Sequence, residues 1–272
     1  MFLANRGFTT FAVLGAIFAA YLFASAPAPL PEANAEVAAE VTVKQLLELC
    51  AAENAAVRAL YTKEIVGKGK QVGLKFDERW HQPGVDAGPL PALFLRETAK
   101  SLERDPVRLA LFLGSDYPIS KANLFRGRQA EVFKSIRKDR RERHFFVEDL
   151  GLYTAMFPDL AVAPACVSCH NEHPDTPKKN WKLDDVMGAT TWTYPKATLS
   201  LAEALEVLAA LRRGFAAAYT SYIDKAKTFK EPPSIGDQWP TNGYYLPTPE
   251  VFMREAELRT SPHSMRGLLA IR

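Results

Sequence analysis

The chain has 272 residues, of which 47% are hydrophobic, and its 34 Lys+Arg and 31 Asp+Glu leave a formal net charge of +3. This length and apolar content suffice for one or two domains with a hydrophobic core. The balanced charge argues against a disordered chain and against a nucleic-acid partner, whose binding would require a basic stripe. The three cysteines are too few for a disulfide scaffold.

The N-terminal segment is apolar and carries no charge between Arg6 and Glu32. A single positive charge precedes an apolar run at 8–26, and an A-x-A triplet follows at 33–35, which is the pattern of a secretory signal peptide. The run is also about long enough to span a bilayer as an uncleaved anchor. Under both interpretations residues 1–35 direct export, and we expect a periplasmic protein or a periplasm-facing, membrane-anchored one in a bacterium.

Helix and strand patterns follow one another in the exported part. Apolar residues at helical spacing predict a first helix from about 40 to 68, which the glycines at 67, 69 and 73 end. Strict alternation at 107–114 predicts a strand, and Gly151 marks a turn between two more strands. The remaining predicted elements are helices at 93–104, 129–141 and near 249–259, and strands at 144–150, 151–157 and 190–194.

The C-terminal part opens with a long amphipathic helix. Ser200 and Glu203 form a capping-box pattern at its start, and Arg212 and Arg213 in its middle exclude a membrane span. No internal repeat is evident. We therefore expect an α+β organisation with a regular core at about 40–198, followed by a helical extension.

The residues that carry chemistry form a C-x-x-C-H motif at 166–170, the attachment site of c-type haem. Cys166 and Cys169 would add to the haem vinyl groups as thioethers, and His170 would lie beneath the iron as an axial ligand. A thioredoxin-type dithiol needs no following histidine. A zinc site that recruits Cys50 would strain a tetrahedral geometry, because two of its ligands are adjacent. Since bacterial haem c is attached outside the cytoplasm, export favours one covalent haem.

The third cysteine, Cys50, falls on the first predicted helix. Most free cysteines are small buried apolar residues, but an unpaired thiol is conspicuous in an exported protein, and a thiolate is an effective iron ligand. Cys50 is therefore one candidate for the distal axial ligand. The alternatives are an open iron site or one of four other side chains: His81, His144, Met156 and Met187.

Residues 166–195 resemble the signature of the Tll0287-like haem domain family. In that signature the motif is followed by Asn and His-Pro, then Ser/Thr-Pro-Lys, Trp-Lys and Asp-Val-x-Gly. A segment at 117–125, YPISKANLF, is similar to a further family segment, and the resemblance covers about 40–198. The matching residues are Asn171, His173-Pro174, Thr176-Pro177-Lys178, Trp181-Lys182 and Asp185-Val186-Met187-Gly188.

The resemblance implies a PAS-like fold at 36–198, an antiparallel sheet with flanking helices that carries one haem c. It implies an iron held by the motif histidine and by a cysteine of the N-terminal helix, which are His170 and Cys50 in this chain. It also implies a sensor of redox state or of diatomic gases. The chain departs from the family pattern at 78–84, where the usual Arg-Asn-Pro turn is missing.

Three lysines and two tryptophans lie close to the motif or to the strand that follows it. The lysines are candidates for pairing with haem propionates, although a solvated loop would have the same composition. The tryptophans are expected to pack in the core or on a haem face. The five residues are Lys178, Lys179, Lys182, Trp181 and Trp192.

Histidine and thiolate ligation together favour ferric iron and predict a low reduction potential. Two strong ligands leave no vacant position, which disfavours O₂ storage and peroxidase turnover. Our hypothesis is a ligand switch, in which reduction weakens the Fe–S bond, releases Cys50 and opens the iron to NO or CO.

Two further functions compete with a sensor: an electron-transfer cytochrome c, and a haem-bearing accessory subunit of a membrane complex. No kinase or transmembrane segment follows residue 198. In each case we expect a protein partner, such as a membrane complex or a redox partner, to bind the extension at 199–272.

Overall fold

The structure is a computed structural model that describes residue 21 and residues 40–269. Apart from residue 21, the predicted signal or anchor segment at 1–35 lies outside the described residues. Among the residues that are described, no helix is both long enough and apolar enough to cross a membrane. Residues 40–269 fall within one compact unit of mixed helix and sheet, which confirms the α+β class.

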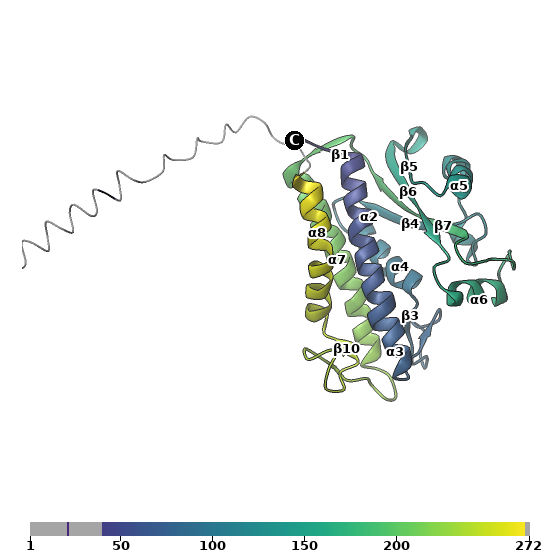
Figure 1. Cartoon of the computed structure of the whole chain (residues 1–272), viewed down its shortest axis with the longest axis vertical. Coiled ribbons are helices and arrows are strands. Elements are labelled where there is room, and N and C mark those ends of the chain that lie inside the picture. Colours follow the sequence, from purple (N-terminus) through teal and green to yellow (C-terminus); the bar gives the residue numbers. More distant parts are fainter. Residues whose placement is uncertain (1–20, 22–39, 270–272) are drawn as a thin grey trace, which may run out of the picture. The chain divides into compact units, whose positions relative to one another are not determined.

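A four-stranded antiparallel sheet with the order β4-β7-β6-β5 occupies the middle of the chain (Figure 1). All four strands were predicted, with limits that differ by a few residues. Gly151 turns the chain between β5 and β6 with a φ of +64°, a conformation that glycine adopts without strain. The strands are β4 (Ala110–Gly114), β5 (Arg143–Val147), β6 (Leu152–Leu160) and β7 (Val186–Tyr194).

The two faces of the sheet pack against different helices. Successive residues of a strand point to opposite faces, so neighbouring residues of β6 enter different apolar clusters. Met156 packs with α5 (Gly127–Asp139) through Phe133, whereas Ala155 joins Trp192 in the larger core that contains α2 (Val43–Leu60). The sheet therefore separates a small cluster under α5 from the main core.

The first helix begins where it was predicted but changes type before it ends. Thr42 caps α2. Its hydroxyl accepts a hydrogen bond from the Gln45 backbone N–H, and the side-chain oxygen of Gln45 accepts one from the Thr42 backbone N–H. A π-helical segment η1 (Tyr61–Gly67) and a short helix α3 (Lys68–Gln71) continue it. These three segments cover most of the predicted helix at 40–68.

The predicted C-terminal extension belongs to the main core. α7 (Leu201–Ala226) packs against α4 (Pro91–Glu103), and α8 (Pro249–Leu269) packs against α2. Figure 1 shows α2, α7 and α8 running side by side. A short antiparallel pair, β1 (Glu40–Thr42) with β8 (Thr198–Ser200), joins the starts of α2 and α7. The regular core therefore continues past residue 198, because the apolar stripe of α7 is buried within the same unit.

The helical layer contains an internal repeat, which the sequence analysis did not detect. The pattern P-x-P-x-x-F-x-R-E occurs at 89–97 and again at 247–255, W-x-x-x-G occurs at 80–84 and 239–243, and Y-T-x-x-I occurs at 61–65 and 219–223. In both copies a helix leads into a loop and then into a second helix. We call residues 43–103 the first hairpin and residues 201–269 the second hairpin.

The two hairpins share their loop contacts. The Tyr61 hydroxyl donates to the Pro89 carbonyl at 2.7 Å, and the Tyr219 hydroxyl donates to the Pro247 carbonyl at 3.0 Å. Each tyrosine ring also stacks on a phenylalanine of the helix that follows the loop, with ring centroids 4.3 Å apart at Phe94 and 4.0 Å at Phe252. A two-residue parallel bridge closes each loop: β2 (Phe76–Asp77) with β3 (Gly88–Pro89), and β9 (Ile235–Gly236) with β10 (Leu246–Pro247).

The hairpins pair crosswise. The first helix of each packs on the second helix of the other, α2 on α8 and α4 on α7, as in a dimer related by a two-fold axis. In the sequence, the sheet lies between the two hairpins, so the two copies of the repeat are far apart and have only scattered residues in common. Comparing neighbouring segments of the sequence therefore does not reveal the repeat.

Candidate functional site

The C-x-x-C-H motif lies on a short helix, α6 (Pro164–Glu172), that begins with Pro164 and ends just before Pro174. Residues three and four positions apart share one face of a helix, so Cys166, Cys169 and His170 lie together. Both thiols are free; Cys166 is half-buried and Cys169 is exposed. The structure therefore brings together the three side chains that were predicted to attach and ligate a haem.

His170 is half-buried, and its Nδ1 atom is buried without a hydrogen-bond partner among the described residues. Burial, with a smaller contribution from the nearby His173, lowers the pKa of His170 below its usual value. A neutral imidazole is the form that binds a metal. Two unpaired thiols beside such an imidazole fit a covalently attached haem.

Two signature residues fix α6 to the rest of the site. The side-chain amide of Asn171 donates to the Trp181 carbonyl at 3.0 Å, and its oxygen accepts from the Trp181 backbone N–H at 2.8 Å. The His173 ring lies 3.2 Å from both carboxylate oxygens of Glu78. Glu78 belongs to the segment at 78–84 where the family's turn is missing, so this loop contacts the motif helix although its sequence differs.

An ion pair that the sequence analysis missed lies next to the motif. Arg58, in the last turn of α2, pairs with Asp159 of β6, which also accepts a hydrogen bond from the Thr190 hydroxyl at 2.9 Å. The charge of Asp159 is the main reason that the pKa of Arg58 is raised, and Cys166 adds to it. The charge of Arg58 is therefore within electrostatic range of the Cys166 thiol. These residues are 101 positions apart, so no local sequence pattern could have linked them.

Cys50 lies on α2 and is fully buried in the main core. Burial raises the pKa of its thiol, and the negative charge of Glu53 adds to that effect. Among the described residues, no hydrogen bond or ion pair links Cys50 to α6. The part of α2 that approaches the motif is its last turn, at Arg58.

The four alternative distal ligands are dispersed over the molecule. The Nε2 of His81 lies 3.0 Å from the Glu97 carboxylate, and that of His144 lies 3.5 Å from the Glu48 carboxylate. The side chain of Met156 is buried in the cluster under α5, on the face of the sheet that does not carry α2. The carbonyl of Met187 accepts from the Ser115 hydroxyl at 2.5 Å.

The lysines after the motif differ in their contacts. The Lys178 ammonium lies 4.0 Å from the centre of the Trp181 ring, a cation–π contact, and also donates to the Asn180 side chain. Lys178 is half-buried, whereas Lys179 and Lys182 are exposed. Of the two tryptophans, Trp192 is fully buried in the main core, and Trp181 is also buried, with a small part of its surface exposed.

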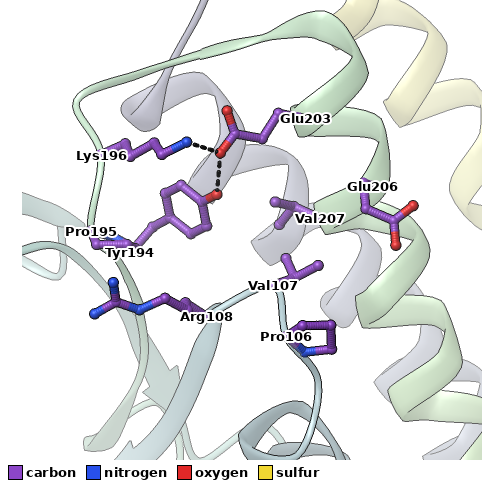
Figure 2. A pocket seen from close by; sticks show the side chains of 9 residues that line it. All are labelled: Pro106, Val107, Arg108, Tyr194, Pro195, Lys196, Glu203, Glu206 and Val207. Carbon is purple, nitrogen blue, oxygen red and sulfur yellow. Dashed lines mark hydrogen bonds and ion pairs between the residues drawn. The ribbon is translucent and has the colours of Figure 1, made fainter.

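A pocket of about 410 Å³ lies away from the motif, where the end of β7 meets the first turns of α7. Figure 2 shows Tyr194 and Lys196 directed at the carboxylate of Glu203, one of whose oxygens accepts from the Tyr194 hydroxyl at 2.9 Å and from Lys196 Nζ at 2.6 Å. Arg108, on the rim of the pocket, has a φ of +48°. None of the residues predicted to hold a haem lines this pocket.

Comparison with known proteins gives one match. A family model described as Tll0287-like matches residues 32–195, a range that includes Cys50 and the whole C-x-x-C-H motif but not α7 or α8. No curated protein and no solved structure matches the chain.

Proposed function

The chain belongs to the Tll0287-like family, and we propose that it is an exported c-type haem protein with a PAS-like haem domain, which senses redox state or a diatomic gas and acts through a protein partner. The observation that carries this proposal is the arrangement of α6, where Cys166, Cys169 and His170 share one helix face with both thiols unpaired. The haem would supply an iron that changes oxidation state and binds diatomic gases.

Each motif residue has a defined task in this proposal. Cys166 and Cys169 tether the cofactor through thioether bonds, and His170 ligates the iron with its Nε2 atom. Asn171 and His173 hold α6 against Trp181 and Glu78, which keeps the imidazole of His170 in place. Lys178, Lys179 and Lys182 remain candidates for pairing with the propionates.

For the distal position we propose Cys50. It is the one thiol outside the motif, and it lies on α2, the helix whose last turn carries Arg58, a charge within electrostatic range of Cys166. Cys50 and His170 would together hold the iron and favour its ferric state, and without the Cys50 ligand the iron would be open to NO or CO. Because Cys50 is buried between α2 and its neighbours, its release would also alter the packing of α2.

The test is absorption and electron paramagnetic resonance (EPR) spectroscopy of the purified exported protein and of three variants. We expect wild type to show covalent haem c with a low-spin, thiolate-ligated ferric signal. Cys50→Ser should lose the thiolate signal and keep the covalent haem, whereas Cys166→Ser with Cys169→Ser should lose covalent attachment. An unchanged ferric spectrum in Cys50→Ser would exclude Cys50 as the ligand. His144→Asn serves as a control that should keep the wild-type spectrum.

A second candidate function is electron transfer, and one observation favours it. Cys169 is exposed on α6, so a haem attached there would have an edge near the surface, where electrons are exchanged. Reduction by small mediators distinguishes the two functions. Rapid reduction and reoxidation with Cys50 bound throughout would favour an electron carrier, and loss of the thiolate signal on reduction would favour a sensor.

We propose that a protein partner binds the exposed surface of the second hairpin. Much of this hairpin is buried in the core, but Leu205 of α7 and Leu258 of α8 are exposed apolar residues that a partner could contact.

A further inference from the structure

Among the described residues, Glu53 is the one charged residue that is fully buried. It lies on α2, and its carboxylate is held from two other helices. The guanidinium of Arg212 on α7 approaches it at two points, Nε to Oε2 at 3.0 Å and Nη2 to Oε1 at 2.6 Å. The hydroxyl of Ser264 on α8 donates to Oε1 at 2.6 Å. The second hairpin therefore supplies every side-chain partner that this carboxylate has among the described residues.

This ion pair lies one helical turn from Cys50. Residues three positions apart are neighbours on a helix, and the charge of Glu53 acts on the Cys50 thiol. Two further side-chain contacts of α2, from Glu48 to His144 and from Arg58 to Asp159, lead to the sheet. Contacts to the second hairpin at Glu53 and to the sheet at Glu48 and Arg58 therefore hold the part of α2 that carries Cys50.

The repeat shows that packing alone does not require a charge at this place. In the register that aligns Tyr61 with Tyr219, Leu211 takes the place of Glu53 and Arg212 takes the place of Asn54. The second hairpin thus packs with a buried leucine at the same position. An ion pair with a buried carboxylate adds little stability over apolar residues of similar volume, and in some proteins such a pair instead fixes one arrangement of the elements that it joins.

We propose that Arg212 is a positioning residue for Cys50, which acts through the buried carboxylate of Glu53 with the support of Ser264. The second hairpin, outside the part of the chain that the family model matches, thereby holds the helix of the distal ligand in place. This inference rests on the proposed function only as far as Cys50 ligates the iron.

The test measures Cys50 directly in the full-length holoprotein. With Cys166 and Cys169 in thioether bonds, Cys50 is the only free thiol, so its alkylation by iodoacetamide can be followed by mass spectrometry. We expect Arg212→Met and Glu53→Gln to raise the alkylation rate by roughly tenfold or more, because removing either partner of this half-buried pair loosens the helices that it joins. The same variants should shift the ferric EPR signal, and Arg212→Lys should restore part of the wild-type behaviour.

Arg213→Met is the matched control. Arg213 is the next residue of α7, is half exposed and pairs with Asp105 and Glu206, so its loss should change neither readout. If Arg212→Met fails to fold, the double variant Glu53→Gln/Arg212→Met removes the uncompensated charge and should still alkylate faster than wild type.

The outcomes separate this inference from the proposed function. Wild-type alkylation rates in Arg212→Met, Glu53→Gln and the double variant would overturn the inference, whatever the iron ligand is. An unchanged spectrum in Cys50→Ser would instead remove Cys50 as the ligand. In that case the alkylation rates still decide whether Arg212 positions the thiol.

Discussion

Asp159 connects three parts of the molecule at the level of single side chains. Its carboxylate receives hydrogen bonds from Arg58 of α2 and from Thr190 of β7, and the charge of Arg58 is within electrostatic range of Cys166. Asp159→Asn keeps the shape of the side chain and removes its charge. We expect the free energy of unfolding, measured with urea, to fall by about 1–2 kcal/mol.

The control for this variant is Asp139→Asn. Asp139 forms an exposed ion pair with Arg143, and exposed pairs contribute little because solvent screens them. No measurable loss is expected there. Equal losses in the two variants would show that Asp159 does no more than a surface carboxylate.

At this scale the sequence identified residues whose spacing along the chain is itself the signal. Cys166, Cys169 and His170 are neighbours in sequence, and helical geometry keeps them neighbours in space. The proximity of these three side chains could therefore be predicted before any fold was known. Arg58 with Asp159, and Glu53 with Arg212, could not be predicted, because nothing local links residues that are 101 and 159 positions apart.

The start of α7 depends on the charge of Glu203. Its carboxylate receives hydrogen bonds from Lys196 and from Tyr194, at the end of β7. Mainly through Lys196, these bonds lower the pKa of Glu203 below its usual value. A lowered pKa in the folded state means that the stabilisation is present above the unfolded value and is lost as the pH falls through the folded value.

We therefore expect Glu203→Gln to be less stable than wild type at neutral pH, with a gap that closes as the pH drops below about 4.5. Thermal unfolding across this range measures the gap. Glu206→Gln is the control, since Glu206 lies one turn later, is exposed and pairs with the exposed Arg213. If the stability difference between wild type and Glu203→Gln stayed constant down to the lowest pH, the charge of Glu203 would not be what stabilises the start of α7.

Most helices and strands could be predicted, because a buried apolar face of a helix or the apolar–polar alternation of a strand leaves a periodic pattern in the sequence. α6 left no such pattern, since none of its residues is buried. The π-helical segment η1 was also missed. It continues the apolar stripe of α2 through Tyr61 and Ile65, so the stripe alone does not show where the hydrogen bonding changes.

At the scale of the whole molecule, the repeat predicts that equivalent substitutions in the two hairpins behave alike. Tyr61→Phe and Tyr219→Phe each remove one buried hydrogen bond to a loop carbonyl. Each should lower the free energy of unfolding by about 1 kcal/mol, and the losses should add in the double variant if the two sites are independent. Chemical denaturation of the three variants tests this. A large loss in one hairpin and none in the other would show that the loops are not equivalent.

A second prediction concerns the boundary at residue 198. A chain that ends there keeps the motif, the sheet and the first hairpin, but α2 and α4 lose the helices that cover them. Such a truncated protein should aggregate or unfold, since it exposes a large apolar face. Solubility and circular dichroism of residues 36–198, compared with 36–272, measure this. A soluble, cooperatively folded short form would show that the second hairpin is dispensable for the fold.

The sequence by itself determined the α+β class, most helices and strands, and the motif residues, because each of these depends on spacing along the chain. The tertiary structure decided the rest: that the second hairpin repeats the first, that it closes the same core, and that Arg212 reaches Glu53. These facts depend on which surfaces meet when the apolar faces of distant helices are buried together. Local patterns encode the faces of each element, and only the packed molecule shows which faces are paired.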